Sequence, residues 1–393
     1  MLKQLILENW KSFRYAELPL DPLTVIIGTN ASGKSNVVEA LEFLKRIARG
    51  ENVEAALAGD KTLPSIRGGV EWAARKPETK FTLKVLIQLD NNDYISSVTV
   101  ATKPFAHILK DSLSVKEYSL DNQEIVDNYP IFEHSYRYNL LQKELQDLKF
   151  SFLDDESGEL SYKSGLINEK IENILVLNPI PDKMRNYSRV YDLMENDASN
   201  IAGVLASLPD QKKEEVESLL SEYIKNLPEG DIKKVWSEKV GRFGTDAMLY
   251  CQEEWKLGEI TEIDARSMSD GTLRFIAILT ALLTRPEGSQ IVIEEIDNGL
   301  HPSRAELLVK TLKEIGKKRN IDILITTHNP ALLDALGPEI VPFVVVAHRD
   351  SETGESKLTL LEDIENLPRL LAGGTLGKLA TKGAIEKSLS KNK

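Results

Sequence analysis

The sequence predicts an α/β fold in which a mixed or parallel sheet is flanked by helices. The apolar strand at 23–27 passes through a glycine-containing loop into a helix whose apolar residues, between 37 and 47, share one face. Buried strands and helices also alternate between about residues 267 and 328, as in parallel sheets covered by helices. Two of these strands end in polar side chains, at the sheet edge where ligands of open α/β folds bind.

The remaining elements are predicted with unequal clarity along the chain. Further strands are expected at 2–7, 81–89 and 94–100. Residues 101–190 are rich in Asn, Asp, Glu, Tyr and Lys, with weak periodicity and a loop-like stretch at 153–158, so we interpret them as a variable insertion. Apolar residues between Val216 and Leu227 predict an amphipathic helix. These patterns divide the chain into four segments: 1–100, 101–190, 191–345 and 346–393.

Composition restricts the class of protein. The 393 residues are 41% hydrophobic and 28% charged, without an apolar run long enough to span a bilayer and without a signal peptide, so we expect a cytoplasmic protein without a membrane partner. One cysteine, Cys251, excludes an internal disulfide, and no Cys/His cluster has the spacing of a zinc site. The net charge of -12 argues against non-specific coating of DNA, although a local basic groove keeps DNA possible as a partner.

The loop after the strand at 23–27 has the pattern G-x-x-x-x-G-K-S from Gly28 to Ser35. Glycines let backbone N–H groups and the helix N-terminus face phosphates, which predicts an ATP site. Lys34 is expected to neutralise the outer phosphates, and the Ser35 hydroxyl is expected to coordinate Mg²⁺. The ATP-binding residues predicted here are Asn30, Ala31, Ser32, Gly33, Lys34, Ser35 and Asn36.

Two carboxylates follow the buried strand that begins at Gln290. Alone, a hydrophobic strand ending in Glu-Glu is more often simply solvated. Together with a phosphate loop, Glu294 becomes a candidate for the magnesium shell and Glu295 a candidate to orient or deprotonate the attacking water.

A Ser-Asp-Gly-Thr turn precedes the apolar run 273–283. Its side chains are suited to cap a helix. The same serine hydroxyl, glycine backbone and helix dipole would also suit a second phosphate-contacting surface that faces the nucleotide of another subunit. The residue types leave these two interpretations equally open for Ser269, Asp270, Gly271 and Thr272.

His328 ends the buried strand at 321–328. A lone histidine is usually structural, yet beside a nucleotide it would hydrogen-bond the γ-phosphate or the attacking water. Between the two strands, Leu300–Glu306 supplies a helix start in which Ser303 and Glu306 have the spacing of a capping box. No role is predicted for His107, His134 and His348, because they lack a comparable sequence context.

The order of these motifs resembles the ABC ATPase superfamily, in the branch of RecF, the SMC proteins and the OLD-like ATPases. The segments Leu7–Phe13 and Ile27–Asn36 are also similar to those of RecF-like proteins. The resemblance implies an ATPase head, in two parts at 1–100 and 191–345, that uses ATP and Mg²⁺. It further implies these roles: a signature turn that contacts ATP across a dimer at Ser269–Thr272, the magnesium and catalytic acids at Glu294 and Glu295, a dimer-facing loop around His301, a switch histidine at His328, and a magnesium-sensing glutamine at Gln88.

Departures from the common ABC motifs indicate which branch of the superfamily the chain resembles. The signature is Ser-Asp-Gly-Thr instead of Ser-Gly-Gly-Gln and the first acid is Glu instead of Asp, both of which are usual in the OLD-like branch. The insertion is too short for SMC coiled-coil arms. The residues after Val341 contain no Asp-x-Asp pair, so the nuclease domain of OLD proteins is not expected.

The resemblance therefore implies an ATPase that dimerises around ATP, or forms a higher oligomer, and regulates a separately encoded effector, such as a nuclease, in bacterial defence against phage. The alternative is a RecF-like DNA repair or DNA-loading ATPase, which DNA-stimulated hydrolysis would distinguish. A transporter ATPase is disfavoured by the signature and by the N-terminal strand.

Overall fold

The computed structural model describes residues 1–90, 92–118, 124–125, 130–133, 155–256, 258–298 and 301–391, which form two compact units. Unit 1 contains Met1–Ile174 and Val345–Leu360, and unit 2 contains Leu175–Val344 and Leu361–Asn392. The expected segment boundary at 345 lies next to a division between units, whereas those at 100 and 190 lie inside a unit.

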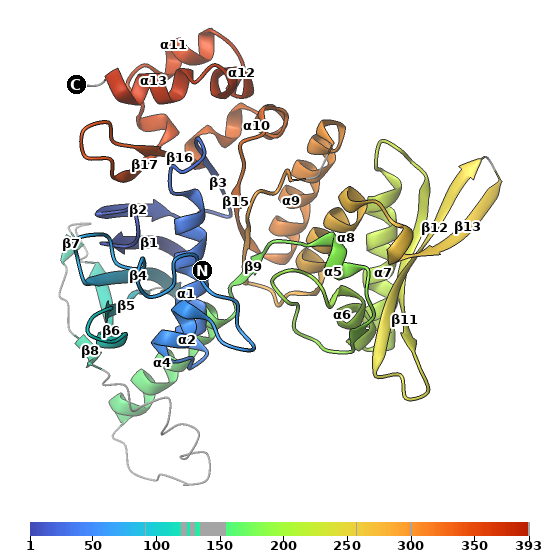
Figure 1. Ribbon diagram of the computed structural model, residues 1–393, viewed down its shortest axis with the longest axis horizontal. Coiled ribbons are helices and arrows are strands. Elements are labelled where there is room, and N and C mark those ends of the chain that lie inside the picture. The colour runs from blue at the N-terminus through green and yellow to red at the C-terminus, as the bar shows by residue number, and fades with distance from the viewer. Residues whose placement is uncertain are drawn as a thin grey trace. The chain divides into compact units, whose positions relative to one another are not determined.

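An antiparallel sheet in the order β2-β1-β4-β5-β6-β7, with β8 on β6, dominates unit 1 (Figure 1). Its strands are β1 (Leu2–Glu8), β2 (Tyr15–Pro19), β4 (Lys80–Leu89), β5 (Asn92–Ala101), β6 (His107–Tyr118), β7 (Glu124–Ile125) and β8 (Pro130–Glu133). Alternate residues of β4 from Phe81 to Ile87 are buried, as expected for a strand with one face on the core. The strands predicted at 2–7, 81–89 and 94–100 are confirmed, and β6 extends the same sheet into the segment interpreted as an insertion.

The remaining elements of unit 1 hold the phosphate loop. Strand β3 (Leu23–Ile27) lies beside β16 (Val344–Arg349), which pairs with β17 (Ser356–Leu360), and the helices are α1 (Lys34–Ala48), α2 (Val53–Ala58) and α4 (Asp155–Glu172). Trp10, Phe43 and Phe81 pack with ring centroids 4.8–5.9 Å apart and join the antiparallel sheet to α1. Trp10 Nε1 also donates to Asn36 O at 2.7 Å, so the first turn of α1 is fixed relative to this sheet.

Unit 2 contains a parallel core in which β14 (Gln290–Ile293) lies between β9 (Leu175–Leu177) and β15 (Asp322–Thr326). Strand β14 pairs in parallel with both neighbours, which confirms the predicted parallel arrangement, and all four of its residues are buried. The strand ends at Ile293, and Glu294 and Glu295 begin the turn that follows it. Around this core lie α8 (Asp270–Thr284), α9 (Ala305–Arg319) and α10 (Pro330–Leu336).

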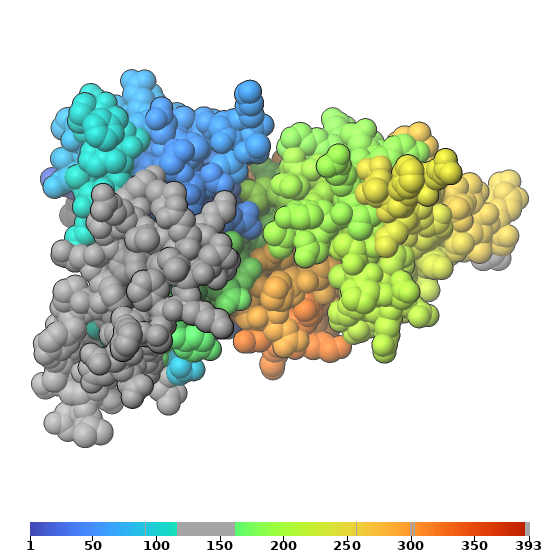
Figure 2. All heavy atoms as spheres, turned by 90° about the horizontal axis from the view of Figure 1, so that it is seen from below, coloured from blue at the N-terminus to red at the C-terminus, as the bar shows by residue number. Residues whose placement is uncertain are grey.

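An antiparallel sheet that the sequence patterns do not predict completes the middle of unit 2. It comprises β10 (Ser188–Arg189), β11 (Ile232–Val240), β12 (Asp246–Lys256) and β13 (Glu259–Asp264), with α5 (Pro181–Met184), α6 (Ile201–Ser207) and α7 (Asp210–Lys225) nearby. Strand β13 is exposed on both faces at its start and therefore lacks alternation. Figure 2 shows the β12–β13 hairpin, in yellow, projecting beyond α6 and α7. The helix predicted near Val216 is confirmed as α7.

Short elements complete the described chain. They are the 3₁₀ helices Ala265–Ser267, Pro302–Arg304, Pro338–Phe343 and Leu361–Asp363, and the helices α11 (Leu367–Ala372), α12 (Leu376–Thr381) and α13 (Ala384–Lys391). No helix within the described ranges combines the length and the apolarity needed to cross a bilayer.

Candidate nucleotide site

The phosphate loop in unit 1 has a backbone that only small residues permit. Gly28 and Gly33 have φ values of 143° and 115°, in the region that favours glycine. A Cβ on Gly28 would lie 2.1 Å from the carbonyl oxygen of Ala347, so a side chain there is excluded by the neighbouring strand. Thr29, Asn30 and Ala31 are exposed, which leaves this arc of the loop open to a ligand.

The start of α1 is arranged to receive an anion. No side chain caps Gly33, and the first turn of α1 carries no acidic residue. Its first N–H groups therefore have no side-chain acceptor, and the positive end of the helix dipole faces the loop. Ser35, the predicted magnesium ligand, lies in this turn and is half-buried.

Two polar groups inside the loop fit phosphate oxygens. Lys34 is 8% exposed, and its Nζ donates to Gly28 O at 2.6 Å and Thr29 O at 3.0 Å, which holds the ammonium against the loop backbone. Ser32 is 2% exposed, and its Oγ has no hydrogen-bond partner. A buried hydroxyl without a partner is costly, so a ligand that accepts its hydrogen bond would relieve that cost. These residues fit the phosphates of a nucleotide.

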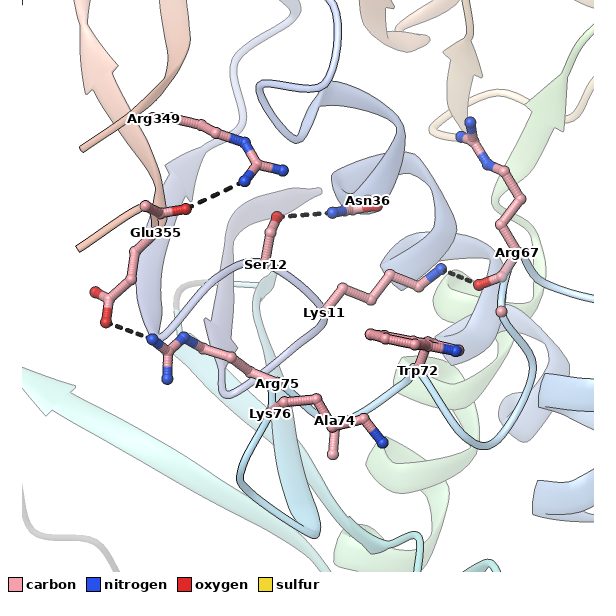
Figure 3. A pocket seen from close by; sticks show the side chains of 12 residues that line it. Lys11, Ser12, Asn36, Arg67, Trp72, Ala74, Arg75, Lys76, Arg349 and Glu355 are labelled. Atoms are coloured by element: carbon pink, nitrogen blue, oxygen red, sulfur yellow. Dashed lines mark hydrogen bonds and ion pairs between the residues drawn. The ribbon is translucent and has the colours of Figure 1, made fainter. Parts of the chain in front are cut away.

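A cavity of about 510 Å³ opens beside the loop in unit 1 (Figure 3). Asn36 Nδ2 donates to Ser12 Oγ at 2.7 Å on one side of it. Arg349 connects the cavity to the loop, because its Nε donates to Ala31 O at 2.8 Å. Trp72, which is 57% exposed, and Arg75 also line the cavity. The cavity therefore combines an aromatic face with cationic groups, next to the proposed phosphate position.

Ion pairs fix the walls of this cavity. Glu39 on α1 accepts from Lys11 Nζ at 2.5 Å and from Arg67 Nε at 2.6 Å, and Arg75 Nη2 lies 2.7 Å from Glu355 Oε1. Burial lowers the pKa of Lys11, an effect that its hydrogen bond to Glu39 opposes. The sequence patterns did not identify Trp72 or Arg75, because they lie in a segment without regular structure and without a motif.

Gln88 lies at the wrong end of its strand for the role the resemblance implies. Its N–H donates to Met1 O at 2.8 Å, beyond the pairing of Leu2 with Ile87. The phosphate loop lies near the opposite end of β1, because Trp10, which follows β1, contacts Asn36 in the first turn of the helix after the loop. The two ends are separated by the seven residues of β1, or roughly 20 Å. The structure therefore does not bring Gln88 to the loop as a magnesium ligand.

In unit 2, the predicted acids occupy a turn that is tied to the end of β15. Glu295 N donates to Thr326 Oγ1 at 2.8 Å, and Ile296 N donates to Thr326 O at 3.1 Å. Glu295 has a φ of 46°, a left-handed conformation that costs a non-glycine residue roughly 1–2 kcal/mol. Glu295 is exposed and Glu294 is half-buried. The strained turn thus holds the Glu295 carboxylate toward solvent.

Asp297 connects this acidic turn to the predicted histidine. Thr327 Oγ1 donates to Asp297 Oδ1 at 2.5 Å, while Asp297 Oδ2 lies 3.9 Å from His328 Nδ1. The His328 side chain is 57% exposed. The structure therefore brings the turn of Glu295 and His328 together. The sequence analysis did not predict a role for Asp297. A third acid so soon after Glu294 and Glu295 could have indicated one.

Ser269 caps α8, which confirms the first of its two interpretations. Its Oγ accepts from Thr272 N at 3.2 Å and donates to Thr272 Oγ1 at 2.9 Å. Both Ser269 and Asp270 remain exposed, so capping leaves the turn accessible to a ligand. One turn into α8, burial lowers the pKa of Arg274, while the carboxylates of Asp270 and Glu295 raise it.

The capping box expected before α9 is wrong. Arg304 is the N-cap residue and makes no capping hydrogen bond through its side chain. Ser303 instead pairs its Oγ with His301 Nδ1 at 2.8 Å, because a 3₁₀ turn precedes the helix. Leu300 and His134 lie outside the described residues. Among the residues that the structure describes, no three His, Cys, Asp or Glu side chains converge on a metal position.

Comparisons with known proteins identify the family and the fold of the chain. The family model described as "AAA domain, putative AbiEii toxin, Type IV TA system" matches residues 23–334. An ATP/GTP phosphatase of Helicobacter pylori is 21% identical over 86% of this chain and 87% of its own length. Structural maintenance of chromosomes protein 1 of Schizosaccharomyces pombe is 27% identical over 45% of this chain, which spans 15% of that protein.

A solved structure of an SMC head bound to the C-winged helix domain of ScpA shares the fold. It has a TM-score of 0.53 and 13% identity, and the match covers 91% of this chain and 96% of that one. The fold is therefore that of an SMC head domain.

Proposed function

The chain belongs to the AAA domain family described as putative AbiEii toxin, Type IV TA system, and it is an ABC-type ATPase of the RecF and SMC branch; from this premise we propose that it works as an ATP-dependent dimer. Two copies would hold two ATP molecules between them. Each nucleotide would contact the phosphate loop of one copy and the Ser269 turn of the other.

The observation that carries this proposal is the pair of helix starts. The N-terminus of α1 is uncapped and carries the buried, unpartnered Ser32 hydroxyl beside it, which suits the phosphates. The N-terminus of α8 presents an exposed serine and an exposed Asp-Gly backbone, which suits a second contact from outside the chain. Mg²⁺ would be held by Ser35, Glu294 and the phosphate oxygens, and it would stabilise charge as the phosphoryl group is transferred.

The cavity beside Trp72 would hold the nucleoside. An indole face stacks on a base, and the neighbouring Arg75 and Ser12 offer hydrogen-bond donors to the ribose and base edges. Arg349, which contacts both this cavity and the loop through Ala31, would couple base recognition to phosphate recognition.

Hydrolysis would start from Glu295. Its carboxylate, held toward solvent by the strained turn, would orient or deprotonate the attacking water. His328 would hydrogen-bond the γ-phosphate or that water, and Asp297 would orient its ring from the Nδ1 side. Release of phosphate would then open the dimer.

The downstream role we propose is regulation of a separately encoded effector, such as a nuclease, in defence against phage. The family description, which refers to a toxin of a type IV toxin–antitoxin system, supports an effector pathway. Copurification of the tagged chain from its own host, with and without ATP, tests this role; recovery of no partner under either condition contradicts it.

Glu295→Gln and Lys34→Ala test the ATPase mechanism. Loss of a general base commonly costs about 10²–10⁴ in rate, so Glu295→Gln should bind ATP, turn over slowly and accumulate as a dimer. Lys34→Ala should lose ATP binding, because the charge that neutralises the outer phosphates is removed. Steady-state hydrolysis, a fluorescent ATP analogue and light scattering report the three properties.

Glu287→Gln is the matched control, because Glu287 is an exposed glutamate shortly before the same strand β14. It should behave as the parent protein. Unchanged turnover in Glu295→Gln would contradict the assignment of the catalytic acid, and retained ATP binding in Lys34→Ala would contradict the site itself.

A further inference from the structure

The Ser269 turn carries a negative charge at the position where it would meet a polyanion. Asp270 is the first residue of α8, and its side chain is 63% exposed. A carboxylate facing the triphosphate of another chain would repel it, since like charges a few ångströms apart destabilise each other. The turn therefore needs a positive partner if it is to contact ATP.

Arg185 supplies that partner from a separate segment of unit 2. It follows the short helix α5, and its Nη2 lies 2.5 Å from Asp270 Oδ1 and donates to Met268 O at 3.0 Å. Its Nη1 lies 3.1 Å from Asp182 Oδ1. One guanidinium thus holds both the backbone before Ser269 and the carboxylate after it.

The segment that carries Arg185 is itself fixed. Ile180 N donates to Asp197 O at 2.9 Å, and Lys183 Nζ lies 2.8 Å from Asp197 Oδ2. Met184 is 1% exposed, so it anchors α5 in the core next to Arg185. The Arg185 side chain is only 23% exposed, which limits the freedom of its charged end.

We propose that Arg185 is a positioning residue for the Ser269 turn, which it fixes through Met268 and whose Asp270 charge it neutralises, so that the turn can contact the ATP bound by a second copy of this chain. This inference rests on the proposed function. Arg185 would not touch the nucleotide. A planar guanidinium suits this task, because it reaches two acceptors in different directions at once.

Arg274 does not take over the role of Arg185. Arg274 lies within α8, and the charge of Asp270 acts on it, but among the described residues its buried Nε has no hydrogen-bond partner, whereas Arg185 donates to Met268 O. Removal of Arg185 would leave Asp270 without its direct ion pair.

The experiment measures ATP-dependent dimerisation in the Glu295→Gln protein, where slow hydrolysis preserves the dimer. Arg185→Ala in this background should raise the ATP concentration for half-maximal dimerisation about tenfold or more, because it removes charged hydrogen bonds. Binding of a fluorescent ATP analogue at low protein concentration should be unchanged, since the phosphate loop is intact. Arg189→Ala, which removes an exposed arginine four residues away, should match the parent.

Asp270→Asn separates charge neutralisation from a merely structural role. Combined with Arg185→Ala, it should restore much of the dimerisation, because the uncompensated carboxylate is gone while the fold is no better supported. Arg185→Lys, which keeps the positive charge but loses the planar fork, should dimerise at an ATP concentration between those of the parent and of Arg185→Ala, which gives a test even if Arg185→Ala fails to fold. Parent-like dimerisation of Arg185→Lys, or no rescue in a folded double variant, overturns the inference.

Mixing two variants gives an independent readout. With Glu295 intact, Lys34→Ala and Arg185→Ala chains should each hydrolyse ATP poorly, yet their mixture should regain activity, because one composite site of each heterodimer then has an intact loop and an intact turn. No recovery in the mixture overturns the inference. Failure of the Glu295→Gln parent to dimerise with ATP overturns the proposed function, whereas normal dimerisation of Arg185→Ala overturns only the role of Arg185.

Discussion

At the scale of single residues, the phosphate loop contains groups that lower the stability of the unliganded fold but suit the binding of a phosphate. Ser32 Oγ is buried without a hydrogen-bond partner, although a buried hydroxyl normally has one. Gly28 and Gly33 likewise have φ values of 143° and 115°, which residues other than glycine rarely adopt. Such local conflicts are typical of functional positions, where the compensating interaction comes from a ligand.

Ser32→Ala should therefore move stability and binding in opposite directions. The free energy of unfolding should stay equal or rise by up to about 1 kcal/mol, because the unsatisfied hydroxyl is removed. ATP affinity should fall by several-fold, because a phosphate loses a donor. Urea denaturation and titration with a fluorescent ATP analogue measure the two effects.

Thr280→Val is the control for Ser32→Ala. Thr280 Oγ1 is also buried without a hydrogen-bond partner, but it lies in the middle of α8. Its replacement should leave ATP affinity unchanged. A loss of stability in Ser32→Ala without a loss of affinity would show that the hydroxyl serves the fold instead of the ligand.

At the scale of elements, α1 and α8 begin in different ways. Gly33 leaves the first turn of α1 open, whereas Ser269 closes the first turn of α8 with its own side chain. A serine cap contributes about 1 kcal/mol of stability relative to alanine, but only a few tenths relative to glycine. This difference allows the structural and functional roles of Ser269 to be separated.

Ser269→Gly and Ser269→Ala form the corresponding test. Thermal denaturation should show a larger loss of stability for the alanine variant, by about 1 kcal/mol, than for the glycine variant. Both should lose ATP-dependent dimerisation to a similar extent, because both remove the hydroxyl that would contact the partner's nucleotide. Normal dimerisation of Ser269→Gly would show that Ser269 acts only as a helix cap.

Elements with a strong local pattern could be predicted from the sequence. Strand β3 and helix α1 follow from the glycine loop between them, and β4 follows from its alternation of buried residues. Strand β13 could not be predicted, because its side chains are exposed on both faces and no periodicity results. Trp72 and Arg185 were missed for a different reason, since their roles depend on contacts with residues distant in the sequence.

At the scale of the whole molecule, the predicted motifs are divided between two units. The phosphate loop belongs to unit 1, while the Ser269 turn, Glu295 and His328 belong to unit 2. In the proposed dimer, ATP bound by unit 1 of one copy also contacts unit 2 of the other. ATP should then stabilise unit 2 as well as unit 1, because a ligand stabilises every part that must be folded to bind it.

The rate at which a thiol reagent labels Cys251 measures the opening of unit 2. It lies on β12, is fully buried, and burial raises the pKa of its thiol to about 12. The thiol is therefore protonated and shielded at pH 8, and a thiol reagent should label it only when this part of unit 2 opens.

ATP at one hundred times its Kd should slow the labelling of Cys251 in the Glu295→Gln protein by about one hundredfold, if opening of unit 2 releases the nucleotide. Mass spectrometry of the quenched reaction gives the rate. Lys34→Ala should show the same rate with and without ATP, because its loop no longer binds the nucleotide. Equal labelling rates of the Glu295→Gln protein with and without ATP would mean that ATP is held by unit 1 alone. The shared site would then be wrong, even if the chain binds ATP tightly.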